Sequence, residues 1–346
     1  MARAHTGTGA SASGGRVSPT CLVVHPGALG DVLLAGPALA HLRSLGYRTT
    51  LATTGRLVAL FEGSGLVDAT VDLEGLALHG LFEEPPSAGA LRALAGYDAV
   101  VSWFGAGDPT FRASLAALGC PVVVARAAPA PAIRRHVSCH LVETLAPLGS
   151  GPLTIPLVRL GVADTARTAA SAWLAARGLG VAEAVVLQPG AGSSAKAWPG
   201  FADLGLRLKD TGLPVVVLAG PADGLAVEAL LAAGVMAEDA VARDWPLAEL
   251  AALLSLVRAS VGNDSGPTHL AAVVGCPTVA VFGPTDPTLW APVGPHVRVV
   301  AARPGSAPWA DVQVSSVEAA LRGLLGGADS AGPFEPVQSS TRRAWP

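Results

Sequence analysis

Residues whose types suit anion chemistry are packed between Asp264 and His269, in the segment NDSGPTHLAA. Ala259 to Gly262 reads as a short buried strand, and Ser265 or Gly266 is expected to cap a helix whose first residue is the following proline. Free N–H groups and the positive end of a helix dipole attract anions at such a turn. A capped helix without a ligand is the alternative. The hydrolase elbow G-x-S-x-G is missing, which argues against a catalytic triad.

A second turn, PGAGSSAKAWP at Pro189 to Pro199, holds Lys196 among small residues. Ser193 and Ser194 offer hydroxyl groups, and Gly192 lets a phosphate approach the backbone closely. The P-loop pattern G-x-x-x-x-G-K-[ST] does not occur, so this is not a nucleotide-triphosphate loop of that kind. The turn predicts a phosphate contact, with a solvent-exposed lysine as the alternative.

Asp31 follows Gly30 at the start of a helix expected over Val32 to Leu45. As the N-cap of that helix, Asp31 would have a complete structural explanation. Placed across a cleft from a phosphate site, the same carboxylate could take a proton from an acceptor hydroxyl. His269 has two explanations as well, since it could donate to a phosphate oxygen or be a satisfied structural histidine.

The elements that must position these turns form two strand–turn–helix halves of similar size. The chain has 346 residues, a length that suggests two domains. Strands are expected at 20–25, 47–53, 97–103, 121–125, 184–188, 214–219, 259–262, 277–282 and 297–301. We expect a disordered arm at 1–19, a first domain at 20–155, a second domain at 156–326 and a flexible tail at 327–346, with the linker within 149–161. Ligands of such sheets bind at the carboxyl ends of the strands, which here would face each other across a cleft.

Composition excludes several classes of function. Charged residues make up 14% of the chain and the net charge is −3, without a Lys/Arg run, which argues against nucleic-acid binding. The four cysteines form no C-x-x-C pair, so buried reduced thiols are expected rather than disulfides or zinc. No metal motif is apparent, and no uninterrupted apolar helix reaches the ~20 residues that cross a bilayer. We expect a cytoplasmic monomer, and peripheral contact with the inner face of the cytoplasmic membrane stays open.

Four segments together resemble glycosyltransferase family 9, the family of ADP-heptose:lipopolysaccharide heptosyltransferases. They are PGALGD at 26–31, PGAGSSAKAWP at 189–199, NDSGPTHLAA at 263–272 and VFGPTDP at 281–287, in the order of the family. The likeness covers about residues 20 to 325. It implies the GT-B fold: two Rossmann-like, doubly wound α/β domains facing across a cleft, with the nucleotide sugar on the second and the acceptor on the first. It also implies an inverting, metal-independent transferase that needs no cofactor and uses a nucleotide diphosphate sugar such as ADP-heptose as co-substrate.

The resemblance also implies roles for single residues. Asp31 looks like the general base, and Gly30, His25 and Arg56 are expected on the acceptor side. The implied donor-binding residues are Gly192, Ser193, Ser194, Lys196, Asp223, Trp245, Asp264, Ser265, Gly266 and His269. Among them, the Lys196 turn and the helix start with His269 would face the diphosphate and Asp264 the sugar. Trp245 would face the nucleobase, and Asp223 the ribose.

The sequence departs from the family pattern in the acceptor half. The basic residue usual before the first turn is replaced by His25-Pro26, and the D-x-Q-like end of one strand is replaced by Ser102-Trp103-Phe104-Gly105. The expected acceptor is a lipopolysaccharide core or another surface glycan. Another GT-B transferase, a sugar-nucleotide epimerase and a non-catalytic nucleotide- or glycan-binding module are the alternatives. The presence of both Asp31 and Lys196 favours an enzyme over a binding module.

Overall fold

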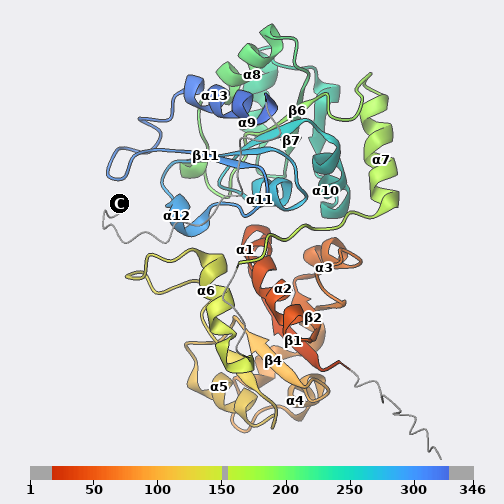
Figure 1. The fold of residues 1–346 in the computed structure, drawn as a ribbon, viewed down its shortest axis with the longest axis vertical. Coiled ribbons are helices and arrows are strands. Elements are labelled where there is room, and N and C mark those ends of the chain that lie inside the picture. The colour runs from red at the N-terminus through yellow and green to blue at the C-terminus, as the bar shows by residue number, and fades with distance from the viewer. Residues whose placement is uncertain (1–17, 150–154, 327–346) are drawn as a thin grey trace, which may run out of the picture.

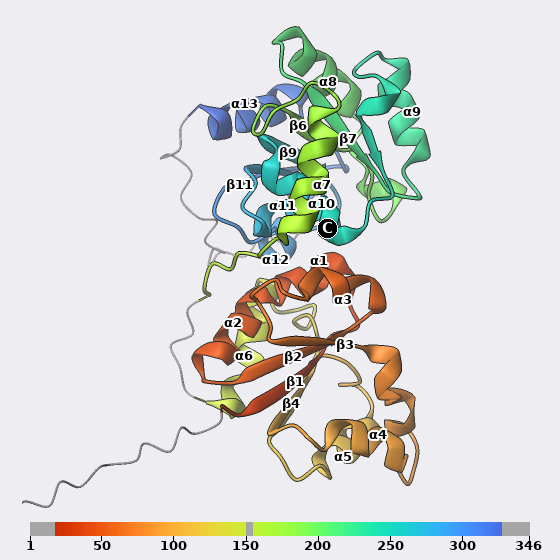
Figure 2. The ribbon, with the colours of Figure 1, turned by 90° about the vertical axis from the view of Figure 1, so that its right-hand side faces the viewer.

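The computed structural model describes residues 18–149 and 155–326. They form two α/β units, each with a parallel sheet, and one unit lies above the other in both views (Figures 1 and 2). Most of the arm expected at 1–19, the whole tail expected at 327–346 and residues 150–154 of the expected linker lie outside the described residues.

The first unit is built on a five-stranded parallel sheet with the order β3-β2-β1-β4-β5. Its strands are β1 (Thr20–Val24), β2 (Arg48–Thr53), β3 (Ala69–Asp72), β4 (Ala99–Ser102) and β5 (Val122–Val124). Its helices are α1 (Leu29–Leu34), α2 (Gly36–Ser44), α3 (Gly55–Phe61), α4 (Ala88–Leu94), α5 (Pro109–Ala116) and α6 (Val137–Thr144), with short 3₁₀ turns η1 (Leu73–Leu76), η2 (Leu78–Leu81) and η3 (Ala146–Leu148). The central strands read as unbroken apolar runs because helices cover both faces of the sheet.

The second unit has a six-stranded parallel sheet with the order β11-β10-β9-β6-β7-β8. Its strands are β6 (Val185–Gln188), β7 (Val215–Ala219), β8 (Val241–Arg243), β9 (Ala259–Asn263), β10 (Thr278–Phe282) and β11 (Val297–Ala301). Its helices are α7 (Asp164–Ala175), α8 (Phe201–Asp210), α9 (Gly224–Ala232), α10 (Leu247–Leu256), α11 (Gly266–Val273), α12 (Pro287–Trp290) and α13 (Val314–Leu325), with 3₁₀ turns η4 (Ser194–Lys196) and η5 (Glu238–Ala240).

In both sheets the strand order reverses next to strands that are followed by the predicted turns. In the first sheet β1 lies between β2 and β4, and in the second β6 and β9 are neighbours although they are distant in sequence. The turns that follow β1, β6 and β9 therefore leave the sheets at their topological switch points, where doubly wound folds bind ligands. The expected fold class, two doubly wound α/β units, is confirmed.

The helix expected over 32–45 is two helices, α1 and α2, which meet at Ala35. Pro37 stands at the second position of α2, where its missing N–H costs nothing, but the same residue would interrupt a continuous helix. The first helix also begins earlier than expected, at Leu29. Asp31 is therefore the third residue of α1, and its predicted place as the N-cap is wrong.

The units meet through α1 and α11, which lie at the junction in both views (Figures 1 and 2). One buried apolar cluster continues across this junction, with Leu39 and Leu57 from the first unit and Leu253 and Leu270 from the second. Glycines let the two helix starts approach closely. A Cβ added to Gly266 would come within about 3.0 Å of Leu29.

Two polar contacts also connect the units. Arg134 forms an ion pair with Asp286 at 2.5 Å. The ring of His136, at the N-cap of α6, has its Nε2 3.0 Å from the carbonyl oxygen of Ala291. The cleft between the sheets is therefore bounded on this side by direct contacts between the units.

Candidate active site

A cavity of about 910 Å³ lies between the two units. Its wall consists of the turn after β1 and the start of α3 from the first unit, and of the turns after β6, β7, β8 and β9 from the second. It has the size of small-molecule sites, which run from roughly 300 to 1,000 Å³. The predicted site residues that line it are Gly30, Arg56, Gly192, Asp223, Trp245, Ser265 and Gly266.

A cluster of charged and polar side chains stands beside the start of α11. The Nζ of Lys196 donates to Oδ2 of Asp264 at 2.8 Å, and the hydroxyl of Thr285 donates to the same oxygen at 2.7 Å. The Nε2 of His269 lies 3.7 Å from the other oxygen of Asp264. Three elements that are far apart in sequence therefore meet at one carboxylate.

This carboxylate stays ionised although it is only 9% exposed. Burial alone would raise the pKa of Asp264, but the contacts with His269, Lys196 and Thr285 outweigh it and lower the pKa to about 2. Lys196 is thus already paired in this structure. A bound diphosphate would share the lysine with Asp264, because an ammonium group has three donors.

The turn that carries Lys196 is fixed to the end of β9 by Asn263. The Oδ1 of this buried side chain accepts from the N–H of Trp198 at 3.0 Å, and its Nδ2 donates to the carbonyl groups of Pro189 and Gly190. The backbone of the turn is therefore held in place before any ligand arrives. Ser193 and Ser194 are exposed on the same turn and do not belong to the cavity wall drawn by the described residues.

No side chain of the described residues caps the start of α11 by a hydrogen bond. Ser265 occupies the N-cap position without a capping bond from its side chain, and its hydroxyl lies 3.1 Å from that of Thr268. Gly266 is the first helical residue and Pro267 the second, so the expectation that the proline comes first was off by one residue. Ser265 and Gly266 at this helix start line the cavity.

The far wall of the cavity holds Trp245 and Asp223. The ring of Trp245 packs edge-to-face on that of Trp173, with centroids 5.2 Å apart. The carboxylate of Asp223 accepts from the N–H of Gly220 at 2.8 Å and packs on Gly190, where an added Cβ would come within about 2.1 Å of the carboxylate. A side chain at position 190 would displace this carboxylate, so the turn after β6 and that after β7 are in direct contact.

Asp31 lies next to the cavity and not in its wall as the described residues form it. Its Oδ2 accepts from the N–H of Ala28 at 3.1 Å, which ties the turn after β1 to the first turn of α1. The neighbouring Gly30 meets the ring of His269, since a Cβ added there would lie about 3.2 Å from it. The structure therefore brings the start of α1 and the start of α11 together, with the Asp264 cluster just beyond.

His25 is a buried support of the turn that follows β1. It is 1% exposed, its Nδ1 accepts from the N–H of Gly27 at 3.1 Å, and its ring packs edge-to-face on Trp103. Burial lowers the pKa of His25 to about 4, so the ring is neutral at physiological pH. His25 therefore supports the turn after β1 and is too buried for open contact with a ligand.

Sequence reasoning gave no role to Asn263 or Thr285, two residues of the site. Both stood in segments already singled out, NDSGPTHLAA and VFGPTDP, but nothing in one sequence indicates which side chain of a motif turns inward. The contact between Asp286 and Arg134 was missed for the same reason.

Over residues 18–149 and 155–326, no group of three or more His, Cys, Asp or Glu side chains could hold a metal ion. In the same residues no helix has the length and apolar character to cross a membrane.

Comparisons with known proteins bear on both units. The model of the family "Glycosyltransferase family 9 (heptosyltransferase)" matches residues 156–316. Lipopolysaccharide heptosyltransferase 2 of Escherichia coli (strain K12) is 34% identical over 112 residues, which are 31% of this chain and 32% of that protein. The matched segment thus spans about a third of the length of this curated relative.

Solved structures match over a much larger part of the chain. A glycosyl transferase family 9 protein from Veillonella parvula DSM 2008 aligns with a TM-score of 0.74 and 21% identity, covering 89% of this chain and 97% of the other. Escherichia coli heptosyltransferase WaaC with ADP aligns with a TM-score of 0.62 and 20% identity, covering 88% and 99%. These likenesses show the shared GT-B fold. The resemblance of this chain to glycosyltransferase family 9 is therefore confirmed, and in sequence it rests on the C-terminal unit.

Proposed function

We propose that this chain is an inverting glycosyltransferase that moves a sugar from a nucleoside diphosphate donor to an acceptor hydroxyl in the cleft between the units. The observation that carries the proposal is the cluster around Asp264. It places one cation, one carboxylate whose pKa is lowered to about 2 and a helix start beside a cavity of suitable size. The second unit, 156–326, holds the donor, and the first, 20–155, holds the acceptor.

The donor we propose is ADP-heptose. The curated relative is named a heptosyltransferase, and one solved relative was determined with ADP, which supports this choice of sugar and nucleotide. Trp245 offers an aromatic face to the base, and Asp223 offers a carboxylate to the ribose at the same wall. Asp264, ionised and partly facing Lys196, offers oxygen acceptors to sugar hydroxyls.

The proposed reaction is a single displacement at the anomeric carbon. The acceptor oxygen forms a bond to that carbon, the bond to the diphosphate oxygen breaks, and ADP leaves with the electron pair. Asp31 accepts the proton of the acceptor hydroxyl. Attack opposite to the leaving group inverts the anomeric configuration.

Charge on the leaving diphosphate is met by groups of the chain itself. We assign this role to the ammonium group of Lys196, which contacts Asp264 and lies outside the cavity wall formed by the described residues, and to the N–H groups at the start of α11, where Ser265 and Gly266 line the cavity. Fixed dipoles of this kind stabilise a developing anion. His269 adds a further donor. We therefore propose turnover without a divalent cation, in a cytoplasmic monomer whose acceptor is a lipopolysaccharide core or other surface glycan reached from the inner face of the membrane.

The proposal is tested by titrating the protein calorimetrically with ADP, UDP and GDP, followed by an assay of ADP release from ADP-heptose with and without chelator. Tight binding of ADP alone and turnover that survives EDTA are expected. Interconversion of the nucleotide sugar without an acceptor would instead identify an epimerase, and binding without any turnover a non-catalytic module. Binding of none of the three nucleotides contradicts the proposal.

A further inference from the structure

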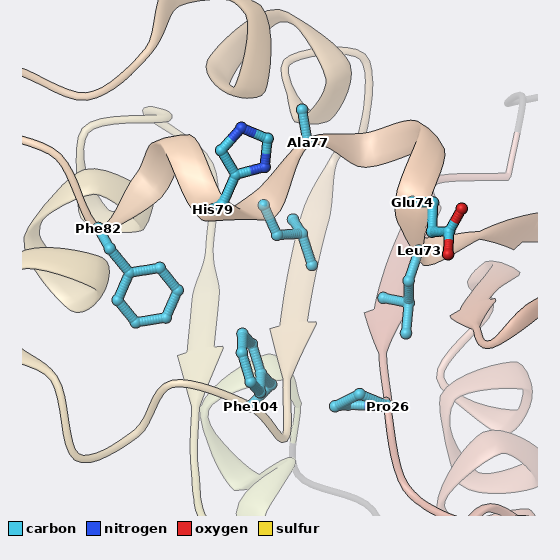
Figure 3. A pocket seen from close by; sticks show the side chains of 8 residues that line it. Pro26, Leu73, Glu74, Ala77, His79, Phe82 and Phe104 are labelled. Atoms are coloured by element: carbon cyan, nitrogen blue, oxygen red, sulfur yellow. The ribbon is translucent and has the colours of Figure 1, made fainter.

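A second cavity, of about 450 Å³, lies wholly within the first unit (Figure 3). It opens between the 3₁₀ turns η1 and η2 and the turn that follows β4. Its wall is formed by Pro26, Leu73, Glu74, Ala77, Leu78, His79, Phe82 and Phe104. Most of this wall is apolar, and two polar side chains, Glu74 and His79, stand at its edge (Figure 3).

Two aromatic rings in this wall are partly exposed. Phe82 is 39% and Phe104 37% exposed, whereas Phe111 behind them is fully buried. The rings are held in a fixed set, with centroids of Phe82 and Phe104 5.8 Å apart and each resting on Phe111. Gly105, with φ +70°, lets the chain turn so closely over Phe111 that any Cβ would clash with its ring. The aromatic surface is therefore rigid before a ligand binds, which lowers the entropic cost of binding.

The cavity adjoins the cleft through one short segment. Pro26 belongs to the wall of the second cavity, and the next residues, Gly27 to Gly30, belong to the wall of the cleft. Both cavities lie at the carboxyl ends of strands of the first sheet, where ligands of such folds bind. A molecule seated on Phe104 can therefore reach past Pro26 toward Asp31.

The charge of the residues that line this second cavity favours an uncharged ligand. Of the described residues, those that line this cavity include no Lys or Arg, and the acidic residue among them is Glu74, which is exposed. A phosphate group would be repelled by this carboxylate and would meet no cation. A sugar ring has an apolar C–H face and a rim of hydroxyl groups, which matches an aromatic floor with a carboxylate and an imidazole at the edge.

We propose that this cavity is the acceptor subsite and that it takes an uncharged sugar ring of the acceptor glycan, with its C–H face on Phe104 and its edge against Phe82, whose ring is nearly perpendicular to that of Phe104. The inference rests on the proposed transferase function and deepens it. It specifies an acceptor that carries no phosphate on the ring next to the reacting hydroxyl. Glu74 and His79 then hydrogen-bond ring hydroxyls, and Pro26 separates the bound ring from the donor.

The test measures binding of named probes by saturation-transfer NMR: p-nitrophenyl glycosides of neutral hexoses and heptoses, and hexose 6-phosphates. Neutral glycosides should bind the wild type, and Phe104→Ala should weaken them roughly tenfold, the order of one lost aromatic contact. Leu206→Ala is the matched control, since Leu206 is 36% exposed on α8 and lies outside the residues that line either cavity. It should leave glycoside binding unchanged.

A second variant, Glu74→Lys, keeps the test valid if Phe104→Ala does not fold. It should admit hexose 6-phosphates that the wild type rejects, by placing a cation where the carboxylate stood. Absence of binding by every neutral glycoside, equal binding by wild type and Phe104→Ala, or a wild-type preference for the phosphates would overturn the inference. ADP affinity is measured in parallel, so that a failure of the donor site, which would contradict the proposed function, is separated from a failure of this subsite.

Discussion

The two units present opposite chemistry to a ligand. Beside the start of α11, the second unit gathers Lys196, Asp264 and His269, which are charged or polar and hold one another in place. At the carboxyl edge of its sheet, the first unit offers Phe82 and Phe104 and hardly any charge. A diphosphate binds best to fixed positive charges and N–H donors, whereas a neutral sugar ring binds to an apolar surface that fits its C–H face. Under the proposed function, donor recognition would be electrostatic and acceptor recognition steric.

The largest expected effect concerns Asp31, the proposed link between the two surfaces. Asp31→Asn keeps an oxygen that can accept from Ala28 N–H, so the fold should persist, but the amide cannot take a proton. Turnover should fall by roughly two to four orders of magnitude, the usual worth of a general base, with little change in donor affinity. The turnover number, the ADP affinity and a melting curve are measured together.

Asp108→Asn is the matched control for Asp31→Asn. Asp108 caps α5, accepting from the N–H of Phe111 at 2.8 Å, and asparagine caps a helix about as well as aspartate. This variant should keep its turnover. Near wild-type turnover in Asp31→Asn would leave the cleft without its base, and a loss of turnover confined to Asp108→Asn would point to Asp108 in its place.

Acid should affect the stability of the first unit and of the junction more than the charge of Asp264. The pKa of His25 in the first unit and that of His136 at the junction are both lowered to about 4, chiefly by burial, from an unfolded value near 6.5. As the pH falls, these histidines therefore bind protons at a higher pH in the unfolded chain than in the folded one. The stability that depends on neutral rings is complete above pH 6.5 and is lost as the pH falls toward 4, by a few kcal/mol. The carboxylate of Asp264, whose pKa is lowered to about 2, keeps its charge over this range.

Chemical unfolding between pH 7 and 4 measures this slope. His25→Gln cannot titrate and should show a shallower dependence on pH than the wild type. An equal slope in both proteins would remove His25 from the account of acid sensitivity.

Lys196→Ala tests the electrostatic side of the comparison. The variant removes the cation that faces Asp264, so ADP affinity should fall by roughly ten- to a hundredfold, the range of one charge-assisted contact. Calorimetric titration with ADP gives the value. Lys209→Ala removes an exposed lysine of the same unit, on α8, which donates to the carbonyl of Gly234. If the two variants bind ADP equally well, Lys196 is not part of the donor site.

Thr285→Val should give the smallest effect. The valine keeps the shape of the side chain but removes the hydrogen bond of 2.7 Å to Asp264, which helps to lower the pKa of that carboxyl. A loss of about 1 kcal/mol in the free energy of unfolding is expected, together with a modest loss of donor affinity. Urea unfolding at neutral pH measures the first quantity. A variant as stable as the wild type would mean that Lys196 and His269 alone hold Asp264.

Prediction from the sequence succeeded best where the pattern is local. The strands β1, β6, β9 and β10 were expected close to their observed bounds because each is an apolar run closed by glycine or proline. The short strands β3 (ATVD) and β8 (VAR) were missed, since three or four residues carry too little periodicity. The break between α1 and α2 was missed although Pro37 marks it, because the apolar spacing continues through the break.

The sequence alone determined that the chain is a two-unit α/β protein and that its turns carry the residue types of a phosphate site. These features depend on neighbours within one turn or one strand, where residue type and spacing are sufficient. Only the tertiary structure decided that Lys196 and Asp264 pair, since 68 residues separate them and two parallel strands must align first.

The apolar cavity at Phe104 is likewise a product of the assembled sheet. Its wall comes from the ends of β1 and β4 and from the turns after β3, and the sequence places those segments far apart. Local propensity fixes a strand or a turn, but which side chains share a surface follows from strand order and register. The residue types of the Lys196 and Asp264 turns could therefore be inferred from motifs, while the shape of the apolar cavity required the fold.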